Sequence, residues 1–333
     1  MTAEPLLSVR DLRVEFSTAA GVVTAVDGAS FDVRRGETVA LLGESGSGKS
    51  VTAQAVLGIV PKPAGRVTGG SIHYDGRDLL TLPAPAKREL RGREIAMVFQ
   101  DPLSSLNPVF RVGAQIGEMF RRHRGASRKE ARAQALELMR RVGIPAAEKR
   151  LDDYPHQFSG GMRQRVMIAM ALALSPRLLI ADEPTTALDV TVQAQIMDLL
   201  ARLQDEEGMS LVLITHDLGV VADVADRVVL MYAGRVVEAG PIREVYEHSA
   251  HPYTTGLMGS LPAIDGPRER LTPIQGGPPD LLDLPSGCSF RPRCNFADQL
   301  CADEEPALLD APGRPLPHSS ACHHSGKVLS DAL

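Results

Sequence analysis

The segment at positions 43–50 constrains the fold of this chain more than any other stretch. It reads GESGSGKS and matches the pattern G-x-x-x-x-G-K-[ST] at every fixed position. An apolar run at 37–42 precedes it, and a helical pattern begins at Lys49. A buried strand that leads through a glycine-rich loop into a helix predicts an α/β fold of the P-loop NTPase class.

The residue types of this loop suit the binding of a nucleoside triphosphate. The glycines let backbone N–H groups point inward at the phosphates, Lys49 reaches the β- and γ-phosphates, and the Ser50 hydroxyl coordinates Mg²⁺. We therefore expect ATP or GTP, together with Mg²⁺, as ligands. The expected binding residues are Gly43, Ser45, Gly46, Ser47, Gly48, Lys49, Ser50 and Val51.

Hydrophobic periodicity beyond the loop predicts strands that alternate with helices. This alternation indicates a parallel sheet with helices on both faces. The expected strands span 7–16, 22–26, 29–33, 178–181 and 210–215, and the expected helices span 127–142, 161–174 and 193–206.

Two adjacent carboxylates end an apolar run in the motif LLIADEP at 178–184. Asp182 suits a role in holding Mg²⁺, directly or through water. Glu183 is a candidate general base, because a carboxylate beside the γ-phosphate can orient and deprotonate the attacking water. The alternative is an acidic pair that caps a strand end.

The motif FSGGMRQR at 158–165 resembles a helix start that is open to an anion. Ser159 suits an N-cap, and Gly160 and Gly161 leave the first N–H groups of the helix uncovered. A plain helix cap explains Ser159 but not the two glycines. Here the chain resembles the ABC ATPase family, and the resemblance implies that Ser159 and Gly161 contact the γ-phosphate of an ATP held by a second nucleotide-binding domain. Gly160 and Gln164 belong to the same signature segment.

The same resemblance implies further site residues and subdomains. Gln100, in MVFQDP, resembles the loop glutamine that contacts Mg²⁺ or water and senses the transmembrane partner. His216 resembles the switch histidine that contacts the γ-phosphate, and both residues are expected to take part in catalysis and in binding ATP and Mg²⁺. Asp189 resembles a residue of the loop that touches the opposite subunit, and Phe16 resembles the aromatic residue that stacks on adenine, although core packing explains a single Phe equally well. The implied fold has a RecA-like core, an antiparallel β subdomain and a helical signature subdomain at about 101–176.

The C-terminal part of the chain narrows the family. HPYTTGL at 251–257 and CSFRPRC at 288–294 resemble the C-terminal region of oligopeptide and dipeptide permease ATPases, with nickel permeases as close relatives. The sequence around 158–200 resembles that of the first, or D-type, subunit of the two non-identical ATPases in such systems. We therefore expect an ATP-hydrolysing subunit for peptide import, with a nucleotide-binding domain over 1–259 and a small cysteine-bearing appendage over 260–333. The implied partners are a second, non-identical ATPase, two permease subunits and an extracytoplasmic binding protein.

Four cysteines all lie after position 287 and predict a metal site. Their separations of five, six and twenty residues lack the close pair of structural zinc sites. Four thiolates suit an iron–sulfur cluster or zinc, with His318, His323 or His324 able to replace one cysteine in a zinc site. The family resemblance favours the cluster, which we expect to be 4Fe-4S. Four reduced structural thiols remain a third interpretation. The expected ligands are Cys288, Cys294, Cys301 and Cys322.

Composition excludes several other classes of function. The net charge of −5 and the absence of Trp argue against a nucleic-acid binder, and the basic run at 121–132 is interpreted as a solvated helix face. The longest apolar run, 166–174, is too short to cross a bilayer, so we expect a peripheral protein at the cytoplasmic face of the membrane. The competing hypotheses are an ABC ATPase that acts on DNA or ribosomes and a redox sensor centred on the cysteines.

Overall fold

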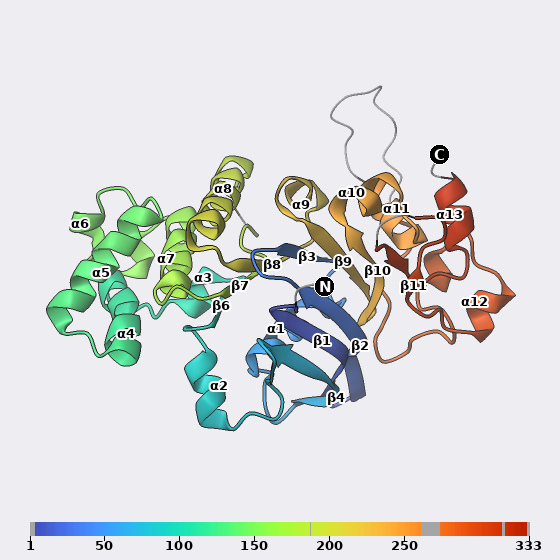
Figure 1. The fold of residues 1–333 in the computed structure, drawn as a ribbon, viewed down its shortest axis with the longest axis horizontal. Coiled ribbons are helices and arrows are strands. Elements are labelled where there is room, and N and C mark those ends of the chain that lie inside the picture. The colour runs from blue at the N-terminus through green and yellow to red at the C-terminus, as the bar shows by residue number, and fades with distance from the viewer. Residues whose placement is uncertain (1–3, 187, 261–273, 315–316, 332–333) are drawn as a thin grey trace. The chain divides into compact units, whose positions relative to one another are not determined.

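The computed structural model describes residues 4–186, 188–260, 274–314 and 317–331 (Figure 1). The chain divides into two compact units. The first comprises Met1–Arg34, Thr38–Thr81 and Thr215–Leu333, and the second comprises Arg35–Glu37 and Leu82–Ile214.

The first unit contains a four-stranded antiparallel sheet with the order β2-β1-β4-β5. Its inner face is apolar, because the side chains of Leu7, Val9, Leu12 and Val14 of β1 are fully buried. A break in the pairing between Val9 and Leu12 shifts the alternation by one residue. The expected strands at 22–26 and 29–33 are one continuous strand, β2. The antiparallel β subdomain implied by the sequence is therefore confirmed. The strands are β1 (Leu7–Thr18), β2 (Gly21–Val33), β4 (Gly65–Tyr74) and β5 (Arg77–Asp78).

A buried strand of the first unit leads into the phosphate-binding loop, as expected. All residues of β3 (Thr38–Leu42) are buried, and it pairs in parallel with β9 (Arg227–Tyr232). The loop then enters α1 (Lys49–Leu57). On the other side of β9, β10 (Arg235–Pro241) runs antiparallel, and α9 (Leu218–Val224) precedes β9.

The cysteine-bearing C-terminal segment belongs to this first unit and extends its sheet. Two short strands continue the order as β11-β12-β10-β9-β3, so residues after 300 pair with the same sheet as the phosphate-loop strand. The apolar anchors of this segment are Phe290 and Val328, both buried. The remaining elements are α10 (Ile242–Glu247), α11 (Pro252–Met258), η2 (Arg291–Arg293), α12 (Gln299–Asp303), β11 (Leu309–Asp310), β12 (Ser319–Ser320) and α13 (Ser325–Asp331).

The second unit contains three parallel strands in the order β8-β7-β6. They are β6 (Ile95–Val98), β7 (Leu178–Asp182) and β8 (Ser210–Thr215), and every residue of β7 and β8 is buried. The long helix α8 (Val190–Glu207) connects β7 to β8, which is the crossover that a parallel pair requires.

Helices dominate the rest of the second unit, where the helical subdomain was expected. Helix α5 begins at a capping box in which the Ser127 hydroxyl accepts from the Glu130 N–H and the Glu130 carboxylate accepts from the Ser127 N–H. Arg132, the last residue of the basic run, makes a bidentate ion pair with Asp152. The helices are α2 (Ala84–Leu90), α3 (Pro102–Ser105), α4 (Val112–Arg124), α5 (Arg128–Arg141), α6 (Ala147–Arg150), η1 (Pro155–Gln157) and α7 (Gly160–Leu172).

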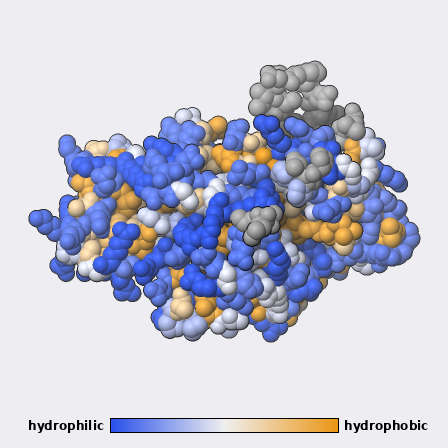
Figure 2. Space-filling view, viewed as in Figure 1, coloured by the Kyte–Doolittle hydropathy of each residue, from blue (hydrophilic) through white to orange (hydrophobic). Residues whose placement is uncertain are grey.

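The surface mixes hydrophilic and hydrophobic residues. On the face drawn in Figure 2, hydrophilic residues cover most of the area and hydrophobic residues are interspersed among them. Within the described ranges, we find no helix of the length and apolar character that a bilayer crossing needs.

The predicted boundary between residues 1–259 and 260–333 stays a prediction. This boundary adjoins residues 261–273, which lie outside the described residues.

Candidate functional site

The phosphate-binding loop requires glycine at two positions for steric reasons. Gly43 has a φ of +148°, and a Cβ there would lie 2.2 Å from the Met231 carbonyl oxygen. Gly48 has a φ of +104°, and a Cβ there would lie 2.6 Å from the Ala25 carbonyl oxygen. The loop therefore passes so close to the backbone of β9 and β2 that only glycine fits.

Lys49 is buried and its ammonium group lies inside the loop. Its Nζ donates to the carbonyl oxygens of Gly43 at 2.6 Å and Glu44 at 2.9 Å, and it lies 3.4 Å from Ser47 Oγ. Phosphate oxygens can take the place of these acceptors, so the geometry suits an anion at the loop. Of the other expected residues, Ser47 and Gly48 are buried, Ser50 and Val51 are half-buried, and Ser45 and Gly46 are exposed.

The first unit also carries Phe16 and His216. The Phe16 ring packs on Gly65, where a Cβ would lie 2.7 Å from its Cε1. This contact agrees with simple packing, so stacking on adenine stays a prediction. His216 is exposed directly after β8, and the next residue, Asp217, caps α9 by accepting from the Gly219 N–H.

Glu183 is oriented by two donors in the second unit. Its Oε2 accepts from Gln100 Nε2 at 2.7 Å and from Thr186 Oγ1 at 2.8 Å. Its backbone has a φ of +45°, an unfavourable value for a residue other than glycine, and its N–H donates to the Ile214 carbonyl at 2.8 Å. Asp182, one residue earlier, is buried at the end of β7. Strained, over-determined backbone of this kind is typical of active sites.

The signature segment opens α7 as expected. Ser159 caps the helix by accepting from the Met162 N–H at 3.4 Å, and Ser159 and Gly160 are exposed. Gly161 is half-buried, and a Cβ there would lie 2.6 Å from Val192 Cγ1. Gln164, in contrast, is only 2% exposed, and its Nε2 has no hydrogen-bond partner in the described part of the chain. A nucleotide contact by Gln164 therefore stays a prediction.

Asp189 caps α8. Its side chain accepts from the Val192 N–H at 3.0 Å and is exposed, so capping explains this residue within one chain. Its expected contact with an opposite subunit stays a prediction.

The four cysteines lie near one another in the first unit, and all four are free thiols. The Cys288 N–H donates to the Cys301 carbonyl at 2.8 Å. Burial, and to a smaller extent the nearby Cys294, Cys288 and Cys301, raises the pKa of the Cys322 thiol to about 12. Burial and neighbouring cysteines also raise the pKa of Cys288 and of Cys294. The fold thus gathers four buried or half-buried thiols, and three of them, Cys288, Cys294 and Cys322, are costly to ionise without a cation.

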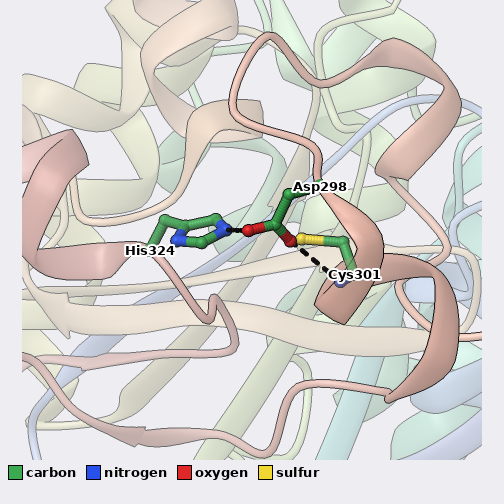
Figure 3. A group of neighbouring side chains, drawn as sticks. All are labelled: Asp298, Cys301 and His324. Carbon is green, nitrogen blue, oxygen red and sulfur yellow. Dashed lines mark hydrogen bonds and ion pairs between the residues drawn. The ribbon is translucent and has the colours of Figure 1, made fainter.

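One cysteine belongs to a compact group that the sequence did not single out. The ligand atoms of Asp298, Cys301 and His324 all lie within 4.8 Å of one another (Figure 3). Asp298 Oδ1 accepts from the Cys301 N–H at 3.2 Å, and its Oδ2 lies 3.0 Å from His324 Nε2. The sequence signal that could have pointed to Asp298 is its position three residues before Cys301, which is the spacing between a helix N-cap residue and the N–H group that it accepts from.

The comparisons with known proteins agree with this geometry. Residues 26–186 match the ABC transporter family, and residues 237–301 match the C-terminal region of oligopeptide/dipeptide transporters. A peptide import ATP-binding protein of Brucella melitensis is 50% identical over 333 residues, which covers 97% of this chain and 98% of the relative. The chain belongs to the oligopeptide/dipeptide group of ABC transporter ATP-binding proteins.

Further similarities cover most of this ABC ATPase. The oligopeptide transport ATP-binding protein OppD of Bacillus subtilis is 51% identical over 305 residues, covering 91% of this chain and 85% of the relative. The ATP-binding cassette MJ0796, solved as a dimer bound to ADP and phosphate, superposes with a TM-score of 0.64 at 29% identity and covers 71% of this chain and 99% of the cassette. The cbiO1 protein of Clostridium perfringens, part of an ABC transporter complex, superposes with a TM-score of 0.62 at 31% identity. The match covers 73% of this chain and 91% of cbiO1. The expected ABC ATPase fold and enzyme class are confirmed.

Proposed function

We propose that this chain hydrolyses ATP to energise the uptake of di- and oligopeptides through partner permeases at the cytoplasmic face of the membrane. The observation that carries the proposal is the combination of two parts in one unit: the phosphate-binding loop with its buried Lys49, and a C-terminal segment of the oligopeptide/dipeptide type that pairs with the same sheet. The relatives named for peptide import span nearly the whole chain, which supports the substrate class.

The residues divide the chemistry among them. Lys49 and the N–H groups of the loop would hold the phosphates of ATP. Asp182 and Ser50 would hold Mg²⁺, which would neutralise charge on the phosphate oxygens. Glu183 accepts the proton of the attacking water, and Gln100 orients the Glu183 carboxylate by its 2.7 Å hydrogen bond. His216 serves as the switch at the γ-phosphate. The residues fit ATP and Mg²⁺, because the chain has the buried Asp182, the hydrogen-bonded carboxylate of Glu183 and the loop that contains Lys49.

We propose that each complete site needs a second ATPase, and the exposure of the signature residues supports this. Ser159 and Gly160 are exposed at the start of α7, so they are accessible to a nucleotide on a facing subunit. We propose that this subunit is a non-identical relative, that the pair drives two permease subunits, and that an extracytoplasmic binding protein delivers the peptide. A dimeric cassette among the similar structures supports the paired arrangement.

We also propose that the four cysteines hold a 4Fe-4S cluster with a structural role. The thiols fit such a group because they converge and are partly buried. Four thiolates around a single zinc ion, each at about 2.3 Å, would lie within about 4 Å of one another. In the described residues, no three cysteine sulfurs lie within 4.8 Å of one another. In a cubane cluster each cysteine binds a different iron, so the sulfurs are spread more widely. A zinc ion on Asp298, Cys301 and His324 is the alternative.

The transport proposal is tested with the complete assembly in proteoliposomes. The vesicles contain the chain, its partner ATPase, both permeases and the binding protein, and uptake of a labelled tripeptide is measured with ATP present or absent. We expect ATP-dependent uptake that is lost with Lys49→Ala in this chain. ATP-dependent uptake of Ni²⁺ with no response to peptides would assign the nickel alternative instead.

A further inference from the structure

The loop between two of the cysteines contacts the phosphate-binding loop. The short helix η2 lies between Cys288 and Cys294, and its last residue is Arg293. Arg293 Nη1 donates to Glu44 Oε2 at 2.6 Å, and its Nη2 donates to Glu44 Oε1 at 2.9 Å. Glu44 is the second residue of GESGSGKS. A bidentate pair therefore joins the cysteine loop to the loop that binds phosphate.

This pair is not a loose surface contact. The Arg293 side chain is 6% exposed and that of Glu44 is 25% exposed. Arg293 Nε donates to the Gln275 carbonyl at 3.0 Å, and its guanidinium lies 5.8 Å from the centre of the Tyr232 ring. Hydrogen bonding to Glu44 raises the pKa of Arg293. Hydrogen bonds and the tyrosine ring thus fix the planar guanidinium, and this orientation makes the bidentate pair both strong and directional.

Glu44 is fixed through its backbone as well as its carboxylate. Its N–H donates to the hydroxyl oxygen of Tyr253 at 2.8 Å, and Tyr253 is fully buried. Its carbonyl oxygen accepts from Lys49 Nζ at 2.9 Å and from the Ser47 N–H at 3.2 Å. Any displacement of Glu44 therefore moves the acceptor that positions the phosphate-binding lysine.

The other end of the connection lies at the cysteines. Cys294 follows Arg293 directly, and Cys288 begins the same turn and is joined by its N–H to Cys301. Between them, the Phe290 ring packs against Tyr232 and Tyr253, with ring centres 5.2 and 5.5 Å apart. A group bound by the cysteines fixes both ends of this turn and hence the place of Arg293.

We propose that Arg293 is a positioning residue that couples the four-cysteine site to the affinity of the phosphate-binding loop for nucleotide. With the cysteine site loaded, the turn at 288–294 holds Arg293 on Glu44, and the loop keeps the shape that receives phosphate. When the bound group is lost, the turn relaxes, Glu44 is released and nucleotide binds more weakly. The coupling to the cysteine site rests on the proposed metal group, whereas the role of the Arg293–Glu44 pair in nucleotide binding does not.

The pair is tested by titration calorimetry of Mg-ADP into the full chain, because ADP avoids the need for a facing subunit. We expect Arg293→Gln and Glu44→Gln each to raise the Kd by about 5- to 30-fold, the lower part of the range for coupled sites. The Kd of the double variant should be no higher than that of either single variant. The Kd of Arg293→Lys should lie between those of the parent and Arg293→Gln, because lysine keeps the charge but cannot make the bidentate hydrogen bond. Arg291→Gln, in the same turn, is the matched control and should leave the Kd unchanged. An Arg293→Gln variant that keeps its fold by circular dichroism and binds within twofold of the parent overturns the proposal.

The coupling is tested by removing the bound group. The Kd for Mg-ADP is compared between chain as purified anaerobically and chain stripped with ferricyanide and EDTA, with iron, sulfide and zinc assayed in each sample. We expect stripping to weaken binding in the parent by a similar factor and to have no further effect in Arg293→Gln. An equal loss in both proteins, or none in the parent, overturns the coupling. A chain that contains no metal as purified contradicts the cluster proposal and the coupling together, while the calorimetric cycle still decides the role of Arg293.

Discussion

Gln100 Nε2 lies 2.7 Å from Glu183 Oε2 in the second unit of the chain. The two residues follow neighbouring parallel strands, β6 and β7, whose carboxyl ends meet at one edge of the sheet. Thr186 Oγ1 donates to the same oxygen at 2.8 Å, so two donors orient the Glu183 carboxylate. The fold therefore joins the glutamine to the carboxylate that we propose as the general base, although 83 positions separate them in sequence.

The first prediction concerns this pair. Gln100→Ala should lower kcat for ATP hydrolysis by the assembled transporter by about 10- to 100-fold, because a misoriented base loses most of its effect. The Kd for ATP should change little, since Gln100 orients the base and does not hold the phosphates. Steady-state hydrolysis and nucleotide titration separate the two quantities. An unchanged kcat would contradict the role given to Gln100.

The second prediction concerns the shared sites. A monomeric sample of the chain should hydrolyse ATP poorly, because we propose that Ser159 and Gly161 act on the nucleotide of a facing subunit. Adding the partner ATPase and permeases should raise the rate, and Ser159→Arg in this chain should block hydrolysis in the partner's site by filling the space for phosphate. Light scattering establishes the oligomeric state. Full activity from a monodisperse monomer would rule this arrangement out.

The third prediction concerns the cysteines. Anaerobically purified chain should be brown and should contain iron and acid-labile sulfide. Both should be lost in Cys294→Ser/Cys301→Ser and retained in Ser289→Ala, which changes a neighbouring residue that is not a ligand. Stoichiometric zinc without iron would refute the cluster and favour the group formed by Asp298, Cys301 and His324.

The fourth prediction concerns His251, the histidine of the HPY motif. Burial lowers its pKa to about 3, and its Nδ1 accepts from the Tyr253 N–H. In the unfolded chain its pKa is about 6.5, so only the unfolded state gains a proton as the pH falls below that value. The contribution of neutral His251 to stability is complete above about pH 6.5 and falls by about 1.4 kcal/mol between pH 7.5 and 5.5.

Denaturant unfolding at several pH values checks this expectation. His251→Gln retains an acceptor for the helix cap but does not titrate, so its stability should depend less on pH in this window. The two proteins share every other titratable group, so the difference between them isolates the contribution of His251. Equal slopes for the parent and the variant would show that His251 is not the titrating group.

Local signals in the sequence predicted the elements that their own residues determine. Strand β8 has the expected bounds because all of its residues are apolar or small, and α5 begins where Ser127 and Glu130 form a capping box. The two strands expected at 22–33 are one, because Gly28, with a φ of +74°, carries the strand through the expected break.

The contacts that determine the site depend on the tertiary fold, and local patterns did not reveal them. Glu44 and Arg293 are 249 positions apart, and each alone resembles an ordinary surface charge. From the sequence alone Asp298 is interpreted only as a helix cap, and its contact with His324 becomes visible only in the folded structure. Motifs with fixed internal spacing could therefore be predicted, whereas pairs made by the docking of the C-terminal segment could not.

The role of Glu183 is tested most directly by Glu183→Gln in the fully assembled transporter. An amide cannot accept the proton of the attacking water, so hydrolysis in the site that contains this residue should fall by about 10²-fold or more, while ATP still binds. The decisive measurement is single-turnover hydrolysis of labelled ATP in that site, with bound ATP counted in parallel. Retained ATP with almost no phosphate released is the predicted result, and phosphate release at the parental rate would contradict it.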